Sequence, residues 1–406
     1  MQYKKHTNCR VCGTNLPEPY LDLGMMPLSN QLMEKATDIA ERYPLQVSFC
    51  PGCFLSQLTI VVDRDILFNN YVYRSGISEG YKAHCRLMAA DLRAWGINDK
   101  SFHVDIAGND GTLLKQFRGV LGGDFRNRVI VDPAGNFMEE NYRQGIPQMP
   151  AFWGADAAAI LGHHVDLITA TNVFAHVDDV KDFLTAGHMA LNKTGIMAIE
   201  FPYLVDFIER KEFDTVYFEH LSYFSLTPLL KLANECGLTV LDAARHEIHG
   251  GSLRVILGKS GNAKTENIDK ILQLEYDANL HQFKTYRDWS QEVERVKTRL
   301  RHGITQLVNN GQRIAGFAAS AKGNVLLNAA GLTNIDIRYI IDETPEKKGK
   351  FSPGTGIHIT DFGYSYAWPD YMIILSWNFA DEVKAKCRRM GYQGKFILPL
   401  NFEICD

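Results

Sequence analysis

Short apolar runs alternate with amphipathic segments from about residue 75 to residue 258. Apolar runs that lack polar alternation are typical of strands covered on both faces, as in a parallel sheet flanked by helices. The pattern therefore predicts successive β/α units. We expect their strands at residues 103–106, 129–131, 167–170 and 196–201.

Residues 265–310 follow a helical pattern, because their apolar side chains recur at steps of three and four residues. Asn310 and Gly311 end this pattern. A second α/β set then begins, with strands expected at 314–318, 337–341 and 372–375. The apolar stripe of the helical segment consists of Tyr286, Trp289, Val293, Val296, Leu300, Ile304 and Leu307.

The first 60 residues carry paired cysteines, several turn residues and little helical periodicity. A chain of 406 residues is too long for one ordinary domain. We expect an α/β fold with a small N-terminal metal module and two Rossmann-like domains. The predicted parts are the module at 1–70, the first α/β domain at 71–260, a helical connector at 261–310 and a C-terminal α/β domain at 311–406.

The formal net charge is −4, from 43 basic and 47 acidic residues. This balance argues against a general nucleic-acid binder, which carries a basic excess, although it does not exclude a local anion pocket. The chain starts without an apolar leader, and no run reaches the length of a membrane span. We therefore expect a cytoplasmic protein with no nucleic-acid or membrane partner, acting as a monomer or a homodimer.

Two Cys-x-x-Cys pairs lie within the first 53 residues, at Cys9 and Cys12 and at Cys50 and Cys53. Cytoplasmic thiols stay reduced, so close pairs indicate a metal rather than a disulfide. Four thiolates form a closed tetrahedral shell for Zn²⁺, which predicts a structural site with no open catalytic position. The alternative is two reduced pairs without a metal. We expect positive φ angles at Gly13 and Gly52, and buried apolar roles for the other four cysteines.

A loop of small residues follows the first predicted strand. Small side chains let the backbone approach a ligand closely, and an acid about twenty residues later can accept ribose hydroxyls. The GxGxxG spacing of a pyrophosphate loop is absent, which favours S-adenosylmethionine over a dinucleotide. Trp153 to Asp156 could reach the adenine edge or form an ordinary loop. The predicted cofactor residues are Asp105, Ala107, Gly108, Asn109, Asp110, Asp132, Pro133 and Asn172.

The segment Tyr217 to Tyr223 places a base, an acid and two phenols close together. Methylation of carbon beside a ketone needs a base to remove a carbon-bound proton and donors to hold the enolate oxygen. His220 suits the base because the pKa of histidine lies near neutral pH. The alternative is the start of a helix that contains a hydrogen-bonded histidine. Farther on, His249 to Arg254 could hold an anion or form a hairpin-like turn into an edge strand.

A second loop of small residues, Ala318 to Asn324, lies between a predicted strand and a predicted helix. Such a loop offers backbone amides and a helix N-terminus to a phosphate, and Lys322 adds charge. Lys347, Lys348 and Lys350 either join this site or form a solvated basic face. The predicted nucleotide-diphosphate site includes Ser320, Lys322, Asn324, Asp342, Lys350, Trp377 and Asn378, with residues 353–355 beside it.

Over essentially its full length, the chain resembles the nucleotide-sugar 3-C-methyltransferases that make branched deoxysugars, such as those of antibiotic pathways. The family's glycine loop usually has glycine where this chain has Ala107, and the extra methyl group is expected to affect cofactor affinity. The resemblance is carried by the two Cys-x-x-Cys pairs, residues 71–75 (Tyr-Val-Tyr-Arg-Ser), 105–111, 172–176, 217–223, 249–254, 320–324, 353–355 and 377–379.

The resemblance implies that a central Rossmann-like domain binds S-adenosylmethionine between the zinc module and a C-terminal nucleotide-binding domain. It implies that His220 abstracts the C3 proton of a 4-ketosugar and that Tyr217, Glu219 and His176 line the sugar pocket. It assigns Tyr71 to the cofactor. The substrate residues that it implies are Tyr73, Ser75, His249 and Arg254, together with those of the C-terminal loop.

The predicted activity is therefore S-adenosylmethionine-dependent C-methylation, at C3, of a nucleotide-diphosphate 4-keto-deoxysugar. A sugar O-methyltransferase would use the same base on a hydroxyl group. An epimerase-like enzyme or carrier would exchange the sugar proton without consuming S-adenosylmethionine. A nucleotide-sugar binding protein would not bind S-adenosylmethionine at all.

Overall fold

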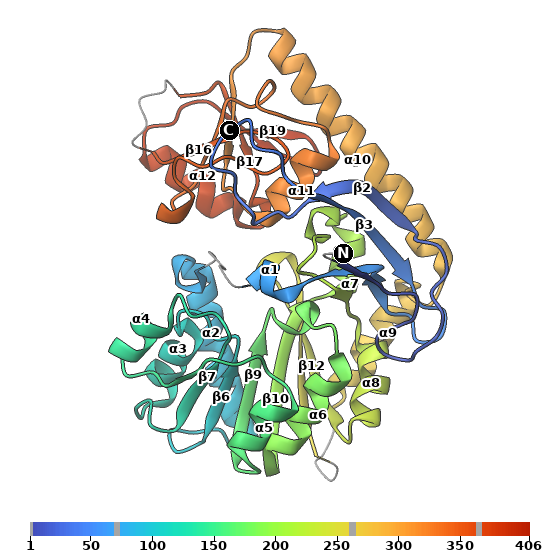
Figure 1. The fold of residues 1–406 in the computed structure, drawn as a ribbon, viewed down its shortest axis with the longest axis vertical. Helices are drawn as coiled ribbons and strands as arrows, with labels where there is room; N and C mark the ends of the chain where they lie inside the picture. The colour runs from blue at the N-terminus through green and yellow to red at the C-terminus, as the bar shows by residue number, and fades with distance from the viewer. Residues whose placement is uncertain (1–2, 69–73, 260–264, 363–367) are drawn as a thin grey trace.

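A computed structural model describes residues 3–68, 74–259, 265–362 and 368–406. It contains a small N-terminal β module, a central α/β domain and a C-terminal α/β domain (Figure 1). The predicted fold class is confirmed, with each of the two larger domains built on a mostly parallel sheet. Within the described residues, no helix is both long and apolar enough to span a membrane.

The N-terminal module is mostly β structure. Its four-stranded sheet has the order β11-β4-β3-β2, and β1 pairs with β5. The strand β11 (Ser222–Tyr223) belongs to the central part of the chain, so the sheet joins residues far apart in the sequence. The other elements are β1 (Tyr3–Lys5), β2 (Leu21–Pro27), β3 (Arg42–Phe49), β4 (Ser56–Leu58), β5 (Ile60–Val62) and α1 (Arg64–Phe68).

The central sheet has the order β12-β13-β10-β9-β6-β7-β8. The four predicted strands are present as β6 (His103–Ile106), β7 (Arg128–Val131), β9 (Val165–Thr171) and β10 (Leu191–Pro202), all parallel to one another. The strand β8 (Gln148–Met149) extends the parallel edge. Its helices are α2 (Glu79–Asp91), α3 (Thr112–Leu121), α4 (Met138–Arg143), α5 (Ala155–Leu161), α6 (Val180–Ala190), α7 (Leu204–Glu209) and α8 (Leu226–Glu235), with short 3-10 turns η1 (Ser75–Ile77), η2 (Leu92–Trp95), η3 (Phe174–His176) and η4 (Phe213–Thr215).

A hairpin completes this sheet. The strands β12 (Thr239–His246) and β13 (Ser252–Gly258) pair antiparallel across the turn η5 (Ile248–Gly250). One of the two interpretations of this segment was a hairpin-like turn into an edge strand. Instead β13 lies inside the sheet between β12 and β10, because β12 forms the edge.

Two helices occupy the segment predicted as helical, namely α9 (Asn267–Asp277) and α10 (Phe283–Asn309). The predicted apolar stripe of α10 is buried from Tyr286 to Ile304, and Leu307 is half-buried. Gly311 follows the helix with φ 76°, as a helix end of this kind requires. With 27 residues, α10 spans about 40 Å and runs beside both β2 and the C-terminal domain (Figure 1).

The C-terminal sheet has the order β16-β15-β14-β17-β18-β19. The predicted strands are present as β14 (Ile314–Phe317), β15 (Tyr339–Ile341) and β17 (Tyr371–Ile374). All neighbouring strands are parallel except β19, which is antiparallel to β18. The other elements are α11 (Ala321–Ala329), η6 (Pro345–Lys347), β16 (His358–Thr360), η7 (Trp377–Phe379), α12 (Ala380–Arg389), β18 (Lys395–Leu398) and β19 (Glu403–Cys405).

Candidate active site

One cavity of about 960 Å³ lies where the two α/β domains face each other. In an open parallel sheet, ligands bind where neighbouring strands send their chains in opposite directions. The central sheet has this point between β6 and β9, and the C-terminal sheet has it between β14 and β17. Asn109 and Asn172 line the cavity from the first point, and Ser320 and Asn378 line it from the second. Two ligand-binding edges therefore open into a single space.

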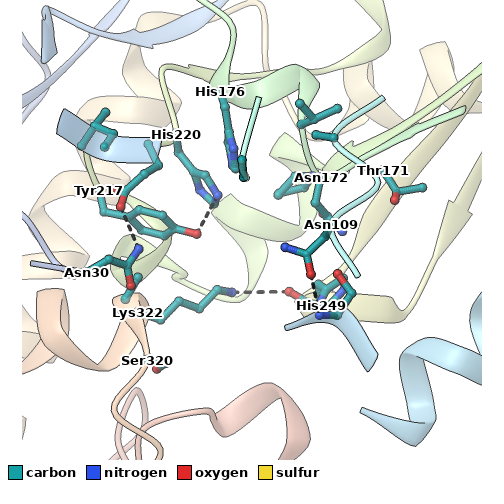
Figure 2. Close-up of a pocket in the computed structure, with 18 of the residues that line it drawn as sticks. Asn30, Asn109, Thr171, Asn172, His176, Tyr217, His220, His249, Ser320 and Lys322 are labelled. Atoms are coloured by element: carbon teal, nitrogen blue, oxygen red, sulfur yellow. Dashed lines mark hydrogen bonds between the residues drawn. The ribbon is translucent and has the colours of Figure 1, made fainter. Parts of the chain in front are cut away.

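The His220 side chain stands inside this cavity and is almost fully buried (Figure 2). Its Nδ1 lies 2.8 Å from the carbonyl oxygen of Thr215, which can only accept a hydrogen bond. This contact fixes the proton on Nδ1, so the lone pair is on Nε2. The Tyr217 hydroxyl lies 2.7 Å from Nε2 and donates to it. The imidazole is therefore a neutral base with its lone pair held by a phenol.

A second imidazole stacks on the first. The His176 ring lies 5.0 Å from the His220 ring, centroid to centroid, at 27°. Burial lowers the pKa of His176 to about 4 and holds the pKa of His220 well below its usual 6.5, and the neighbouring His176 contributes to the second shift. Both rings are consequently uncharged at neutral pH. The predicted group of Tyr217, Glu219, His220 and His176 does meet in one place.

The Glu219 carboxyl group reaches the same cavity and is 1% exposed. Its Oε1 accepts a hydrogen bond of 2.7 Å from Nδ2 of Asn30, while Oε2 has no hydrogen-bond partner within the described chain. Burial raises the pKa of Glu219. Asn30 follows β2 in the N-terminal module, so sequence reasoning missed it: no local signal connects it with Glu219 across 189 residues. Oε2 can therefore accept a hydrogen bond from a hydroxyl group of a ligand.

The C-terminal domain contributes Ser320 and Lys322 to the cavity (Figure 2). Ser320 caps α11, because its hydroxyl oxygen accepts a hydrogen bond from the amide of Gly323. The Lys322 ammonium group lies 3.3 Å from Oε2 of Glu212 and 3.4 Å from the carbonyl oxygen of His249, both in the central domain. Burial raises the pKa of Glu212 to about 7, although Lys322 acts in the opposite direction. This contact ties the two domains together at the cavity wall.

Comparisons with known proteins cover nearly the whole chain. Residues 9–68 match a family described as a zinc binding domain, residues 81–243 a methyltransferase domain, and residues 247–401 a C-methyltransferase C-terminal domain. The C-methyltransferase NovU of Streptomyces niveus is 31% identical over 404 residues, which cover 97% of this chain and 95% of that protein. The chain belongs to the C-methyltransferase family. This C-methyltransferase uses S-adenosylmethionine as its methyl donor and carries a zinc-binding module.

Two solved structures resemble part of the C-methyltransferase. The magnesium protoporphyrin IX methyltransferase of Synechocystis PCC 6803, with bound S-adenosylmethionine, has a TM-score of 0.35 and 12% identity, over 47% of this chain and 88% of that one. A 1,6-didemethyltoxoflavin-N1-methyltransferase of Burkholderia thailandensis has a TM-score of 0.33 and 16% identity, over 44% of this chain and 80% of that one.

The loop after β6 fits the methyl donor. Asn109 has φ 52° and donates its backbone amide over 2.9 Å to Oδ2 of Asp132, whose Oδ1 accepts from the amide of Ala134 at 2.8 Å. These bonds hold the Asp132 carboxylate at the cavity wall, and a carboxylate held in this way can accept hydrogen bonds from the hydroxyl groups of a ribose. Phe152 and Trp153 line the wall beside it, which suits an adenine ring. Ser75 donates its backbone amide to Oδ1 of Asn109.

We expect Asp132→Asn to weaken S-adenosylmethionine binding by about 10-fold, because it removes the charged acceptor. Asp342 offers a matched control. It follows β15 as Asp132 follows β7, and its two oxygens likewise accept the amides of Ala319 and Thr344. Asp342→Asn should leave the affinity for S-adenosylmethionine unchanged in calorimetry. Equal losses in the two variants would contradict the assignment.

Ala107 has φ 53°, a backbone region that costs a non-glycine residue about 1–2 kcal/mol. We expect Ala107→Gly to raise the free energy of unfolding by about 0.5–1 kcal/mol, since this relief exceeds the entropic cost of glycine. Urea unfolding would measure it. Ala159→Gly, on the exposed face of α5, is the control and should lower the free energy by about 1 kcal/mol. If Ala107→Gly instead lowered the free energy of unfolding, the backbone at Ala107 would not be strained.

Some predicted cofactor residues support the loop rather than line the cavity. Asp105 lies below the loop and accepts a 2.7 Å hydrogen bond from the Thr169 hydroxyl group, and burial raises its pKa to about 7. Gly108 packs so close to Asp105 and Ile130 that a side chain would not fit. Asp110 accepts from the backbone amides of Gly76 and Thr112. Pro133 lines the cavity, and Tyr71 and Tyr73 lie outside the described residues.

Arg254 was expected at the substrate but lies away from the cavity. It stands opposite Glu200 on neighbouring strands and donates its Nε over 2.9 Å to that carboxylate. Its other nitrogens contact Asp91 and His84. Because its guanidinium group is buried and fully engaged, Arg254 stabilises the sheet below the site. His249, from the same motif, does line the cavity.

Three residues that were predicted to bind the nucleotide likewise contact other protein groups instead of lining the cavity. Asn324 donates to the Ser352 hydroxyl and to the Pro353 carbonyl oxygen. Lys350 lies 3.2 Å from Glu34, and Trp377 donates its indole NH to Asp214. The turn at Gly354 packs against Pro27 and Arg42 of the N-terminal module. The lysine cluster divides, since Lys347 lines the cavity and pairs with Asp342, which also lines it, whereas Lys348 pairs with Asp361 outside the cavity.

The four predicted metal ligands do converge. The sulfur atoms of Cys9, Cys12, Cys50 and Cys53 all lie within 4.8 Å of one another. The pairs Cys9–Cys53 and Cys12–Cys50 are 3.5 and 3.4 Å apart. A tetrahedron with Zn–S bonds of about 2.3 Å has sulfur–sulfur edges of about 3.8 Å, so the cluster fits zinc. Because the four cysteine sulfurs would fill all four coordination positions of the zinc ion, none is left for a substrate, and the ion is structural.

The two cysteine turns share one backbone pattern. Gly13 and Phe54, each directly after a second cysteine, have φ angles of 74° and 67° and donate their amides to the carbonyl oxygens of Cys9 and Cys50. The prediction of positive φ is therefore right for Gly13 and wrong for Gly52. Gly52 is small for another reason: a β-carbon there would lie 2.5 Å from the Thr14 hydroxyl oxygen.

Proposed function

We propose that this C-methyltransferase transfers a methyl group to C3 of a 4-ketosugar carried on a nucleoside diphosphate. The observation that supports it best is the single cavity shared by two ligand-binding sheet edges, with the neutral His220–Tyr217 pair on its wall. One edge suits S-adenosylmethionine. The other, with the capped helix α11 and Lys322, suits the phosphates of a nucleotide.

The residues act on the sugar in a defined order. Nε2 of His220 accepts the proton from C3, and the C–H electrons move to the C4 ketone oxygen as an enolate. The ketone makes this step possible because it acidifies the adjacent C–H bond. The Tyr217 hydroxyl group, released from Nε2 by the sugar, donates to the enolate oxygen. S-adenosylmethionine supplies an electrophilic methyl group, whose bond to sulfur breaks as the bond to C3 forms, so that S-adenosylhomocysteine leaves and the ketone is restored. The proton on Nε2 then passes to solvent.

Glu219 holds the sugar in this arrangement. Its Oε2 accepts a sugar hydroxyl group while Asn30 restrains Oε1. His176, stacked on His220, keeps the base in its plane and helps keep it neutral. Tyr73 is proposed to bind the sugar and Tyr71 the cofactor, as the resemblance implies.

Product analysis tests the proposal. The enzyme is incubated with S-adenosylmethionine and a panel of dTDP-, GDP-, UDP- and CDP-linked 4-keto-deoxysugars. We expect one methyl group to be added to at least one of them, and NMR should show a quaternary C3 in place of a C–H carbon. A methyl group at another carbon, or equal turnover of sugars without a nucleotide, would contradict the proposal.

The low pKa of His220 sets the expected pH dependence. Burial favours the neutral ring, so the base is lost only when the pH falls through a value below 6.5. We expect the acid limb of the kcat/KM profile to lie below pH 6.5. The unfolded chain binds this proton more readily, so His220 also lowers the free energy of unfolding as the pH drops below 6.5. An acid limb at or above pH 6.5 would be inconsistent with His220 as the base.

A further inference from the structure

Arg10 lies between the first two metal ligands, yet its side chain points away from the metal cluster and is only 1% exposed. Its Nε lies 3.1 Å from Oδ1 of Asp178, and its Nη1 donates to the carbonyl oxygens of Leu58 and Leu221, at 3.0 and 3.3 Å. Two of these partners belong to the central domain. The cysteine turn therefore reaches directly into the methyltransferase domain.

Those two partners stand next to the active-site histidines. Leu221 directly follows His220, and Asp178 lies two residues after His176. One guanidinium group thus holds both histidine loops. The loops come from different parts of the domain, and the stacking of His176 on His220 depends on their spacing.

Further contacts connect the same loop to the module. The amide of Arg10 donates to the side chain of Gln57, and Gln57 pairs with Ser222 across β4 and β11. The amide of Leu58 donates to the Leu221 carbonyl oxygen at 2.9 Å. The chain that leaves His220 is therefore a strand of the module's own sheet. A buried arginine has defined geometry only when its acceptors are in place, because leaving its charge unpaired is costly.

We propose that Arg10 is a positioning residue that makes the zinc-binding turn set the spacing of the two active-site histidines. The module thereby organises the half of the site that handles the sugar. The proposal rests on the proposed function only for the roles of His176 and His220. The contacts of Arg10 stand without it.

Hydrogen exchange of the full-length, zinc-loaded protein tests the coupling without any substrate. In Arg10→Met, we expect amide exchange in residues 174–179 and 216–223 to rise at least about 10-fold, because two loop anchors are lost together. Zinc stoichiometry and S-adenosylmethionine affinity should stay at the parent level. Thr14→Ala is the matched control, since Thr14 contacts the Cys12 sulfur but neither histidine loop.

Kinetics provide a second readout. We expect Arg10→Met to lower kcat about 10- to 100-fold, while the KM for S-adenosylmethionine changes little, because a misplaced base slows proton removal rather than cofactor binding. Arg10→Lys keeps the charge but cannot reach Asp178 and Leu221 together, so we expect only partial recovery. Unchanged exchange in both segments of a folded, zinc-bound Arg10→Met protein would overturn the proposal.

Asp178→Asn keeps the test decisive if Arg10→Met loses zinc. This variant leaves Arg10 and the metal turn intact and weakens one anchor. We expect faster exchange in 174–179 alone, with 216–223 still held by Arg10 and β4. Exchange at the parent rate in 174–179 would overturn the proposal. Because no sugar is present, a wrong substrate assignment would not affect this outcome.

Discussion

His220→Asn should lower methyl transfer about 100- to 10,000-fold, the range typical for loss of a general base. Asparagine fills a similar space but cannot accept a proton at neutral pH. The Thr215 carbonyl contact and the Tyr217 hydroxyl contact identify Nε2 as the accepting atom, so no other nitrogen of the ring can replace it. Steady-state turnover with S-adenosylmethionine and the ketosugar accepted by the parent enzyme measures the loss.

The control must separate loss of the base from loss of the fold. His246 is another histidine with a depressed pKa, about 4, but it lies outside the cavity beside His84. His246→Asn should keep turnover within about 2-fold of the parent. His220→Asn should also lose solvent deuterium exchange at C3 when S-adenosylhomocysteine replaces the methyl donor. Wild-type turnover in a folded His220→Asn protein would refute the assignment.

Both sheets could be predicted from the sequence because their central strands are mostly buried and contain short apolar runs. The strands β6, β9, β14 and β17 are of this kind, although β6 and β9 each include an aspartate. The strand β11 contains only two residues and exists because β4 lies beside it. No local pattern predicts a strand whose stability comes from a partner 165 residues away.

The difference between local and long-range contacts also explains which residues of the candidate site could be predicted. The base cluster at residues 217–220 could be predicted because its chemistry is contained in one short segment. Asn30 and Arg10 could not, since each acts on a residue that only domain packing brings near. Arg254 was assigned to the substrate because the resemblance implied it. Its partner Glu200 lies on the facing strand, and this pairing is invisible until the sheet order is known.

The structure also relates two loops whose sequences look unlike each other. Ala107 and Ala318 both follow a central strand with positive φ, and a carboxylate after the next strand accepts a loop amide in each case. The two domains therefore share one backbone arrangement, which under the proposed function serves two different ligands. They differ in charge: Lys347 lies 3.2 Å from Asp342, whereas Asp132 has no cation partner in the described chain. A free carboxylate suits a ribose, and a neutralised one is compatible with nearby phosphates.

Removing one zinc ligand should have an equally large effect. We expect Cys50→Ser to lose the metal and to abolish methyl transfer, because zinc binding supplies about 10–16 kcal/mol in small zinc modules. Leu45, Val47 and Leu55 of the module are fully buried, and β4, which pairs with β3 on one side, pairs with β11 on the other. Unfolding of the module would therefore release the chain that follows His220. Metal analysis, turnover and hydrogen exchange measure these three losses.

The site of damage distinguishes this effect from general unfolding. The helices α2 and α3 pack into a separate core that contains no residue of the module, so their amides should remain protected in Cys50→Ser. Cys405→Ser is the matched control, because Cys405 lies in β19 outside the cluster and is half-buried. It should retain zinc and full turnover. Cys50→Ser could instead keep slow amide exchange in β11 together with methyl transfer. The metal would then be dispensable for the geometry around His220, and the four thiolates would stabilise only the module.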